Sequence, residues 1–236
     1  MYPPTGFGYD RAITIFAPNG RLYQVEYSLE AVRRGTTAIG IRASDGVVLV
    51  VEKRVSPLQE PSSIEKIFIV DSHVGVAIAG LTADARILID NARVEAQSHR
   101  YLYDEPIDVK KKKKRVCDIK QSYTQRAGVR PFGVSLLIAG VDREPQLFMT
   151  DPSGAYWGYK ATAIGSGGHD AKMKLEESYN DNINVEDAIK LALKILSEVS
   201  QLKLTVDNVE IAYIKMVDKK FRKLSDDEKL EYLKTI

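Results

Sequence analysis

Residues 18–37 have the sequence PNGRLYQVEYSLEAVRRGTT, and this stretch decides how the fold is interpreted. Its apolar side chains recur at helical spacing, at Leu22, Val25, Leu29 and Val32. The preceding Pro18-Asn19-Gly20 is typical of a turn that also offers an N-cap, and Gly35 favours a helix end. The pattern predicts an amphipathic helix over residues 20–35 that leads directly into a strand.

The composition indicates a globular protein without a metal or cofactor. The 236 residues are 44% hydrophobic and 28% charged, which is ordinary for a chain with a sizeable core. A single cysteine, Cys117, cannot form an internal disulfide and suits a reducing compartment. The three histidines lack metal-ligand spacing, and no apolar run approaches the length of a membrane span. We therefore expect a cytoplasmic protein that is not a membrane protein.

The rest of the chain alternates strand pairs with helix pairs. The expected strands are 36–42, 47–53, 66–70, 74–79, 134–141, 146–149, 155–160, 209–216 and a short one near Phe221. The expected helices are 82–99, 108–125, 170–179, 185–200 and one from Asp226. This order suits two antiparallel sheets packed face to face with helices outside, an α+β fold in four αββα layers.

Several motifs, in order along nearly the whole chain, carry a resemblance to a known family. They are Tyr9-Asp10-Arg11, 21–27, 33–37, 63–66, 79–81, 123–125, 128–133 (GVRPFG) and 163–167 (AIGSG). Together they resemble the α subunits of proteasomes, most of all those of the archaeal type. The resemblance implies an Ntn-hydrolase-like αββα sandwich with an extra N-terminal helix. It also implies one α-subunit domain over 1–236, with a gate segment (1–12), the helix (20–35) and the sandwich (36–236).

The resemblance implies a function in protein degradation without catalysis by this chain. Seven copies would form the outer ring of the 20S core, stacked on a ring of β subunits that carry the threonine nucleophiles. The ring would gate the entry of unfolded polypeptide, template assembly and dock regulatory ATPases through their C-terminal tails. The chain would thus be a structural and gating subunit of a threonine-type endopeptidase complex, with no cofactor of its own.

Three groups of residues match functional positions of that family. The gate residues are Tyr9, Asp10, Arg11, Pro18 and Tyr27. The activator pocket, which lies between neighbouring subunits in the family, corresponds to Lys66, Gly35, Leu22 and Gly80. There the lysine pairs with the terminal carboxylate of an ATPase ending in a hydrophobic residue, a tyrosine and any residue. The pore annulus corresponds to Arg126, Ala127 and Gly128, where the family usually has tyrosine or histidine and two glycines.

Two of these positions have alternative interpretations. Lys66 begins a predicted strand, so the sequence alone favours a side chain that points to solvent. Gly35-Thr36 matches the place where the catalytic β subunits are cleaved to free a threonine, with Lys66 near the place of their assisting lysine. The alternative function is therefore an active threonine peptidase after cleavage before Thr36. Cleavage would discard the helix that carries the most specific motifs, so we expect Thr36 to be an ordinary strand residue.

Residues 110–115 form a basic run, KKKKKR, that departs from the family pattern. A solvated helix face is favoured over a polyanion site, because no aromatic residues interleave with the run, and no nucleic-acid partner is expected. The apolar stripe of the same helix must include Lys112 or Lys113. That lysine is expected either to snorkel to water or to leave the helix poorly seated locally. On the preceding helix, Asp84 and Asp90 do not share a face, and both are expected to be solvated.

Overall fold

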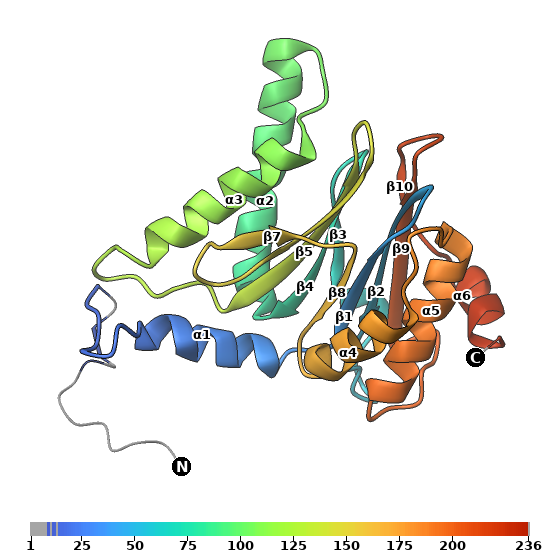
Figure 1. The fold of residues 1–236 in the computed structure, drawn as a ribbon, viewed down its shortest axis with the longest axis horizontal. Coiled ribbons are helices and arrows are strands. Elements are labelled where there is room, and N and C mark those ends of the chain that lie inside the picture. The colour runs from blue at the N-terminus through green and yellow to red at the C-terminus, as the bar shows by residue number, and fades with distance from the viewer. Residues whose placement is uncertain (1–8, 10, 13, 236) are drawn as a thin grey trace.

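The computed structural model describes residue 9, residues 11–12 and residues 14–235. This part of the chain forms two five-stranded sheets in which all neighbouring strands are antiparallel (Figure 1). The first sheet has the order β10–β9–β2–β1–β8, with bounds Phe221–Lys223, Val209–Lys215, Gly46–Glu52, Ala38–Arg42 and Ala161–Ile164. The second has the order β3–β4–β5–β6–β7, with bounds Ile67–Asp71, Val74–Gly80, Val134–Val141, Pro145–Thr150 and Tyr156–Gly158.

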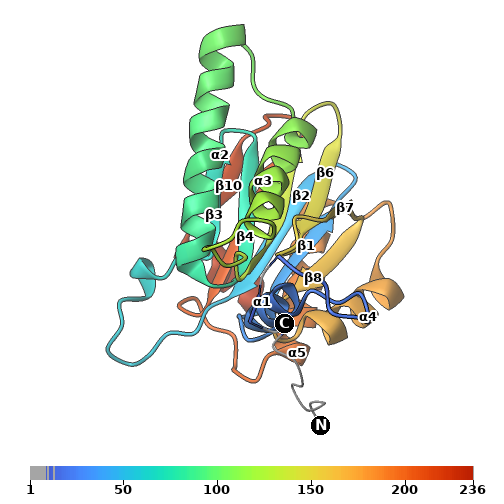
Figure 2. The same cartoon turned by 90° about the vertical axis from the view of Figure 1, so that its left-hand side faces the viewer.

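Helices cover the outer face of each sheet. α2 (Thr82–Tyr103) and α3 (Val109–Tyr123) pack on the second sheet and lie side by side (Figure 2). α4 (Gly168–Ser178) and α5 (Val185–Val199) pack on the first sheet, and α6 (Asp226–Leu233) lies against α5. The predicted four-layer αββα sandwich is confirmed.

The central strand β2 shows why the sheets are buried on both faces. Val48 and Val50 pack against the helices of the first sheet, whereas Val47, Leu49 and Val51 pack into the core between the two sheets. All five side chains are buried. Because neighbouring side chains on a strand point to opposite faces, a continuous run of branched apolar residues fills both cores at once.

The N-terminal helix α1 spans Tyr23–Arg33 and lies across one end of the sandwich, against β4 and β5 (Figure 1). It is shorter than the predicted range of 20–35. The predicted N-cap is wrong, because Leu22 occupies the cap position without a side-chain hydrogen bond. The Asn19 Oδ1 atom instead accepts a hydrogen bond from the Arg21 amide at 3.2 Å and holds the preceding turn.

Gly35 joins α1 to β1 at a point of very close backbone approach. A Cβ atom on Gly35 would lie 2.3 Å from the Gly80 nitrogen at the end of β4. Gly80 itself has φ +111°, and a Cβ atom there would lie 2.2 Å from the Gly133 carbonyl oxygen. Only glycine fits at either position, since both contacts are with backbone.

One predicted strand is wrong. The single strand expected over 155–160 is divided between the sheets, because β7 ends at Gly158 and β8 begins at Ala161. Between them the Tyr159 amide donates to the Leu147 carbonyl of the second sheet, and the Arg42 amide donates to the Lys160 carbonyl. The chain therefore crosses from one sheet to the other within two residues.

Candidate functional site

The amino group of Lys66 lies beside the first residue of α2. The amides of Lys66 and Ile67 both donate to Glu210 Oε2 at 2.8 Å, which fixes the start of β3. The half-buried Lys66 side chain donates from Nζ to Thr82 Oγ1 at 3.1 Å. Burial lowers the pKa of Lys66, Glu210 opposes this effect, and Arg54 adds to it. The alternative of a lysine directed simply to solvent is not what the structure shows.

The start of α2 lacks a side-chain cap. Leu81 stands at the N-cap position, makes no side-chain cap hydrogen bond, and its amide donates to the Gly133 carbonyl at 2.9 Å. An α-helix leaves its first N–H groups without intrahelical partners and carries a partial positive charge there. The Lys66 ammonium therefore adds a full charge to the positive end of a helix, an arrangement suited to a carboxylate or another small anion.

Gly35 and Gly80 lie at the same place as Lys66, but Leu22 does not. Gly35 touches Gly80, and Gly80 is two residues from Thr82. Leu22 caps the opposite end of α1, and 13 residues separate it from Gly35. At about 1.5 Å per helical residue this separation is about 20 Å. One copy of the chain thus brings together three of the four predicted pocket residues.

Asp84, in the first turn of α2, ties the helix to the segment before β5. Its carboxylate accepts from Arg130 Nη1 at 2.6 Å, from Arg130 Nη2 at 2.8 Å and from the Gly133 amide at 2.8 Å. Burial pushes the pKa of Asp84 up, but the Arg130 and Gly133 hydrogen bonds outweigh it and hold that pKa below its usual value. The prediction that Asp84 is solvated is therefore wrong, whereas Asp90 is exposed and pairs with Arg93.

The predicted annulus residues lie on the exposed connection between α3 and β5. Arg126, Ala127 and Gly128 are all exposed, and Gly128 has φ +82° with no atom within 4 Å of the place a Cβ would take. Within the described residues, Arg126 has no carboxylate within ion-pair distance. The three residues therefore project from a loop whose base is held by Arg130.

The predicted gate residues that the structure describes are Tyr9, Arg11 and Pro18, which precede α1 in the chain, and Tyr27, which lies on α1. Tyr9 is half-buried, Arg11 and Pro18 are exposed, and Asp10 lies outside the described residues. Tyr27 is 45% exposed and its ring stacks on that of Tyr23, with 6.3 Å between centroids. Tyr27 therefore presents an exposed aromatic face on α1.

A cluster of buried and half-buried polar side chains lies at the other end of the α2–α3 pair, and apart from Lys112 its members were not predicted. It consists of Asp71, His73, Glu95, Lys112, Asp142 and Gln146, and we call it the α2–α3 cluster. Lys112 is 1% exposed, its Nζ atom makes no hydrogen bond to the described residues, and Asp71 Oδ2 is 4.0 Å away. Burial lowers the pKa of Lys112 to about 8, although Asp71 and Glu95 oppose the change. Of the two expected outcomes for this lysine, snorkelling to water is wrong, because its side chain is buried.

The remaining residues of the basic run do not form one free positive face. The Lys113 ammonium lies over the Phe148 ring at 3.6 Å and over Tyr156 at 4.5 Å. Lys114 donates to Asp118 at 2.8 Å, and Lys111 lies 3.9 Å from Asp108. These contacts favour the interpretation of the run as a helix surface rather than a polyanion site.

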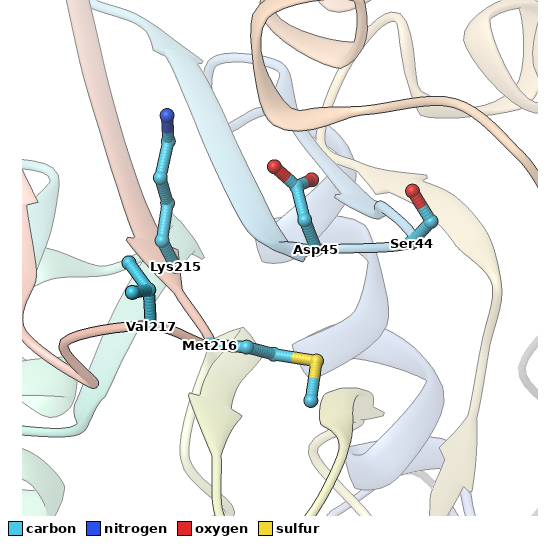
Figure 3. A pocket seen from close by; sticks show the side chains of 5 residues that line it. All are labelled: Ser44, Asp45, Lys215, Met216 and Val217. Carbon is cyan, nitrogen blue, oxygen red and sulfur yellow. The ribbon is translucent and has the colours of Figure 1, made fainter.

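A hollow of about 380 Å³ lies between the β1–β2 turn and the end of β9. Figure 3 shows its lining side chains, Ser44, Asp45, Lys215, Met216 and Val217. Its polar groups serve the fold: Asp45 accepts from the Val185 amide at 2.9 Å, Ser44 donates to the Ile183 carbonyl, and Lys215 pairs with Glu186. No ligand-binding role is assigned to this hollow.

Comparison with known proteins identifies the family of this chain. Residues 32–214 match the family described as proteasome subunit, and residues 9–31 match the N-terminal signature of A-type proteasome subunits. The chain belongs to the proteasome family. The signature over α1 and its approach marks it as an α-type subunit, as the resemblance of the sequence had indicated.

Archaeal relatives align with the chain over almost its full length. The chain is 55% identical to the proteasome alpha subunit of Methanothermobacter thermautotrophicus over 97% of this chain and 93% of the relative. The corresponding protein of Thermococcus sp. strain KS-1 is 52% identical over 100% of this chain and 90% of its own length. That of Archaeoglobus fulgidus is 53% identical over 96% and 92%.

Thr36 lies in a packed part of this proteasome-type fold. It lies between α1 and β1, is 6% exposed, and its hydroxyl has no hydrogen-bond partner in the described part of the chain. The Lys66 ammonium is directed to Thr82 instead. The carbonyl of Gly35 accepts from the Ser166 amide at 2.8 Å, so the Gly35-Thr36 junction is part of the packed fold.

None of the helices in the described part of the chain is both long and apolar enough to span a membrane. No cluster of three or more histidine, cysteine, aspartate or glutamate side chains in that part of the chain could hold a metal ion.

Proposed function

We propose that this chain is a non-catalytic α subunit whose seven-membered rings cap a proteasome core in the cytoplasm. Each ring stacks on β subunits, templates their assembly and controls the entry of unfolded polypeptide. The family membership supports the subunit type, and the packed, unactivated Thr36 supports the absence of catalysis by this chain.

The observation that carries the docking part of the proposal is the position of Lys66 at the uncapped start of α2, next to Gly35 and Gly80. This place offers a charged donor beside a positive helix end, which suits the terminal carboxylate of a regulatory ATPase tail. Leu22 lies about 20 Å away along α1. A pocket that uses all four residues therefore needs Leu22 from a neighbouring copy, in agreement with a pocket between subunits.

The gate and the annulus complete the proposal. Tyr9, Asp10, Arg11, Pro18 and Tyr27 hold the N-terminal segment at the axial entrance. Arg126, Ala127 and Gly128 line the narrowest part, on an exposed loop that Asp84 fixes to α2 through Arg130. A ring of Arg126 side chains makes this entrance positively charged, because arginine stays protonated at neutral pH.

The test for catalysis compares Thr36→Ala with the unchanged chain, each assembled with β subunits. Hydrolysis of a short peptide should proceed at the same rate in both particles. The intact mass of the purified chain should include residues 1–35. A large loss of rate in a Thr36→Ala particle that assembles normally, or a mass that lacks residues 1–35, would instead support the threonine-peptidase alternative.

A further inference from the structure

Thr82 is the hydrogen-bond partner of the lysine on which the proposed pocket depends. Its Oγ1 atom accepts from Lys66 Nζ at 3.1 Å, and Thr82 is the first residue of α2. We infer that Thr82 is a positioning residue, which holds the Lys66 ammonium at the start of α2 in the orientation that captures a terminal carboxylate. The inference rests on the proposed function of Lys66.

The Lys66 side chain is fixed at both of its ends. Its backbone is held by Glu210, which accepts from the amides of Lys66 and Ile67. The long flexible stem would otherwise sample many rotamers, so the hydroxyl at its tip selects one of them. An ammonium group has three N–H donors. One of these N–H groups donates to Thr82 Oγ1, so two remain to donate to an incoming carboxylate.

Thr82 is itself fixed by the backbone around it. The preceding Gly80 approaches both Gly35 and the Gly133 carbonyl too closely for any side chain, and the Leu81 amide donates to Gly133. Two residues later, Asp84 is held by Arg130 and by the Gly133 amide. The hydroxyl therefore belongs to a rigid part of the structure, and the flexible lysine is ordered against it.

The hydroxyl also favours the charged form of the lysine. Burial lowers the pKa of Lys66, Glu210 on β9 raises it, and Arg54 in the segment after β2 lowers it. Thr82 on α2 contributes a neutral acceptor to the ammonium. Without that acceptor, the charged form of the buried Lys66 amine would lose a stabilising hydrogen bond. Lys66 would therefore lose its proton at a lower pH.

The experiment measures the binding of two synthetic peptides to the particle assembled with β subunits. Both end in a hydrophobic residue, a tyrosine and one further residue; one has a free carboxylate and the other is amidated. The variants are Thr82→Val, which keeps the shape without the acceptor, Thr82→Ser, which restores it, and Thr82→Ala. Thr205→Val makes the same change at an exposed residue before β9 and serves as the matched control.

Thr82→Val and Thr82→Ala should weaken binding of the free-carboxylate peptide about 5- to 10-fold, as expected for the loss of one ordinary hydrogen bond that orders the site. Thr82→Ser and Thr205→Val should bind it within about twofold of the unchanged particle. The amidated peptide should be unaffected by all four changes. In Thr82→Val, the loss of carboxylate binding at alkaline pH should begin at a lower pH than in the unchanged particle.

Two results would overturn the inference. One is binding of the free-carboxylate peptide to Thr82→Val within twofold of the unchanged particle, with the same pH profile. The other is an equal loss for both peptides, which would indicate a structural role only. Failure of the proposed function is distinguishable, because Lys66→Ala would then bind the free-carboxylate peptide as tightly as the unchanged particle.

Discussion

The charged side chains at the two ends of the α2–α3 pair differ in their hydrogen bonding. Where α2 begins and α3 ends, Lys66, Asp84 and Lys120 each have hydrogen-bond partners at 2.6–3.2 Å. At the opposite end, around the α2–α3 cluster, Lys112 Nζ and Asp71 Oδ2 are buried without a hydrogen bond to the described residues. The first end holds all three side chains with hydrogen bonds. At the second, Arg100 donates to Asp71 Oδ1 at 2.9 Å, but the Lys112 ammonium is left without a hydrogen bond to the described residues.

The contrast is sharpest between the two buried lysines of α3. Lys120 is 0% exposed, and its ammonium donates to the Val134 carbonyl, to Thr150 Oγ1 and to the Asp151 carbonyl. Burial lowers the pKa of both lysines to about 8. Both lysines therefore lose a similar amount of solvation. Lys120 makes three hydrogen bonds in return, whereas Lys112 makes none to the described residues. Replacing Lys120 should lower the free energy of unfolding, and replacing Lys112 should raise it.

The largest effect is expected at Lys66, where α2 begins. Lys66→Ala removes the charged partner of a carboxylate in a partly dry site, a loss of about 2–5 kcal/mol for a buried pair. Stimulation of peptide hydrolysis by an ATPase tail peptide should therefore disappear at concentrations that saturate the unchanged particle. The readout is the ratio of stimulated to unstimulated rate, and full stimulation of the variant would remove Lys66 from the pocket.

The next effect is expected at Lys120, where α3 ends. Lys120→Met keeps most of the buried volume but removes the ammonium donor of the Val134 carbonyl and of Thr150 Oγ1, whereas the Asp151 carbonyl keeps its hydrogen bond from the Gly154 amide. The free energy of unfolding should fall by about 2–4 kcal/mol, because unsatisfied buried acceptors cost about 1–3 kcal/mol each and the removed charge offsets part of this. Chemical denaturation of the isolated chain measures it. Unchanged stability would show that the three hydrogen bonds contribute nothing.

A smaller effect of opposite sign is expected at Lys112. Lys112→Leu replaces an ammonium without hydrogen bonds by an apolar side chain and should raise the free energy of unfolding by about 1–2 kcal/mol. Lys113→Leu is the matched control on the next residue. It removes the contacts of Lys113 with the Phe148 and Tyr156 rings and should not stabilise the protein. A gain at Lys113 with none at Lys112 would reverse our assignment of the buried position.

The smallest effect is a pH dependence of the difference between Lys112→Leu and the unchanged chain. The folded pKa of Lys112, about 8, lies below its ordinary value of 10.5, so the unfolded chain binds more protons between these values. The penalty of the buried charge is therefore complete below pH 8 and is relieved as the pH rises towards 10.5. The advantage of Lys112→Leu should shrink by about 1 kcal/mol between pH 8 and pH 9.

Taking the difference in the free energy of unfolding between Lys112→Leu and the unchanged chain removes the effect of other groups that titrate at similar pH, because both proteins contain them. Burial raises the pKa of the Cys117 thiol to about 11, and Lys120 is common to both proteins. A stability difference between Lys112→Leu and the unchanged chain that stays constant from pH 7 to pH 10 would contradict the assignment of a charged, buried Lys112.

Much of the fold could be predicted because its signals are local. The apolar run of β2 and the stripe of α2 depend on spacing along the chain, and β5 was predicted with its observed bounds, 134–141. The strand β8 was missed because it has only four residues and follows β7 after a two-residue crossing. A pattern within one segment does not show that the chain changes sheets there.

The site was less predictable because its contacts join distant segments. Asp84 and Arg130 are 46 residues apart, and nothing near either residue signals their pairing. The stripe of α3 left Lys112 and Lys113 as equal candidates, since neighbouring residues differ by about 100° around a helix. Only the packing against Asp71 and Glu95 identifies Lys112 as the buried one. The separation of Leu22 from Gly35 follows from the length of α1 alone.

The measurement that tests the central claim most directly is a native mass determination of the purified chain, alone and mixed with a proteasome β subunit. The proposed function predicts a ring of several copies in the first case or a larger particle that contains both proteins in the second. The mass of a single copy in both cases would contradict it.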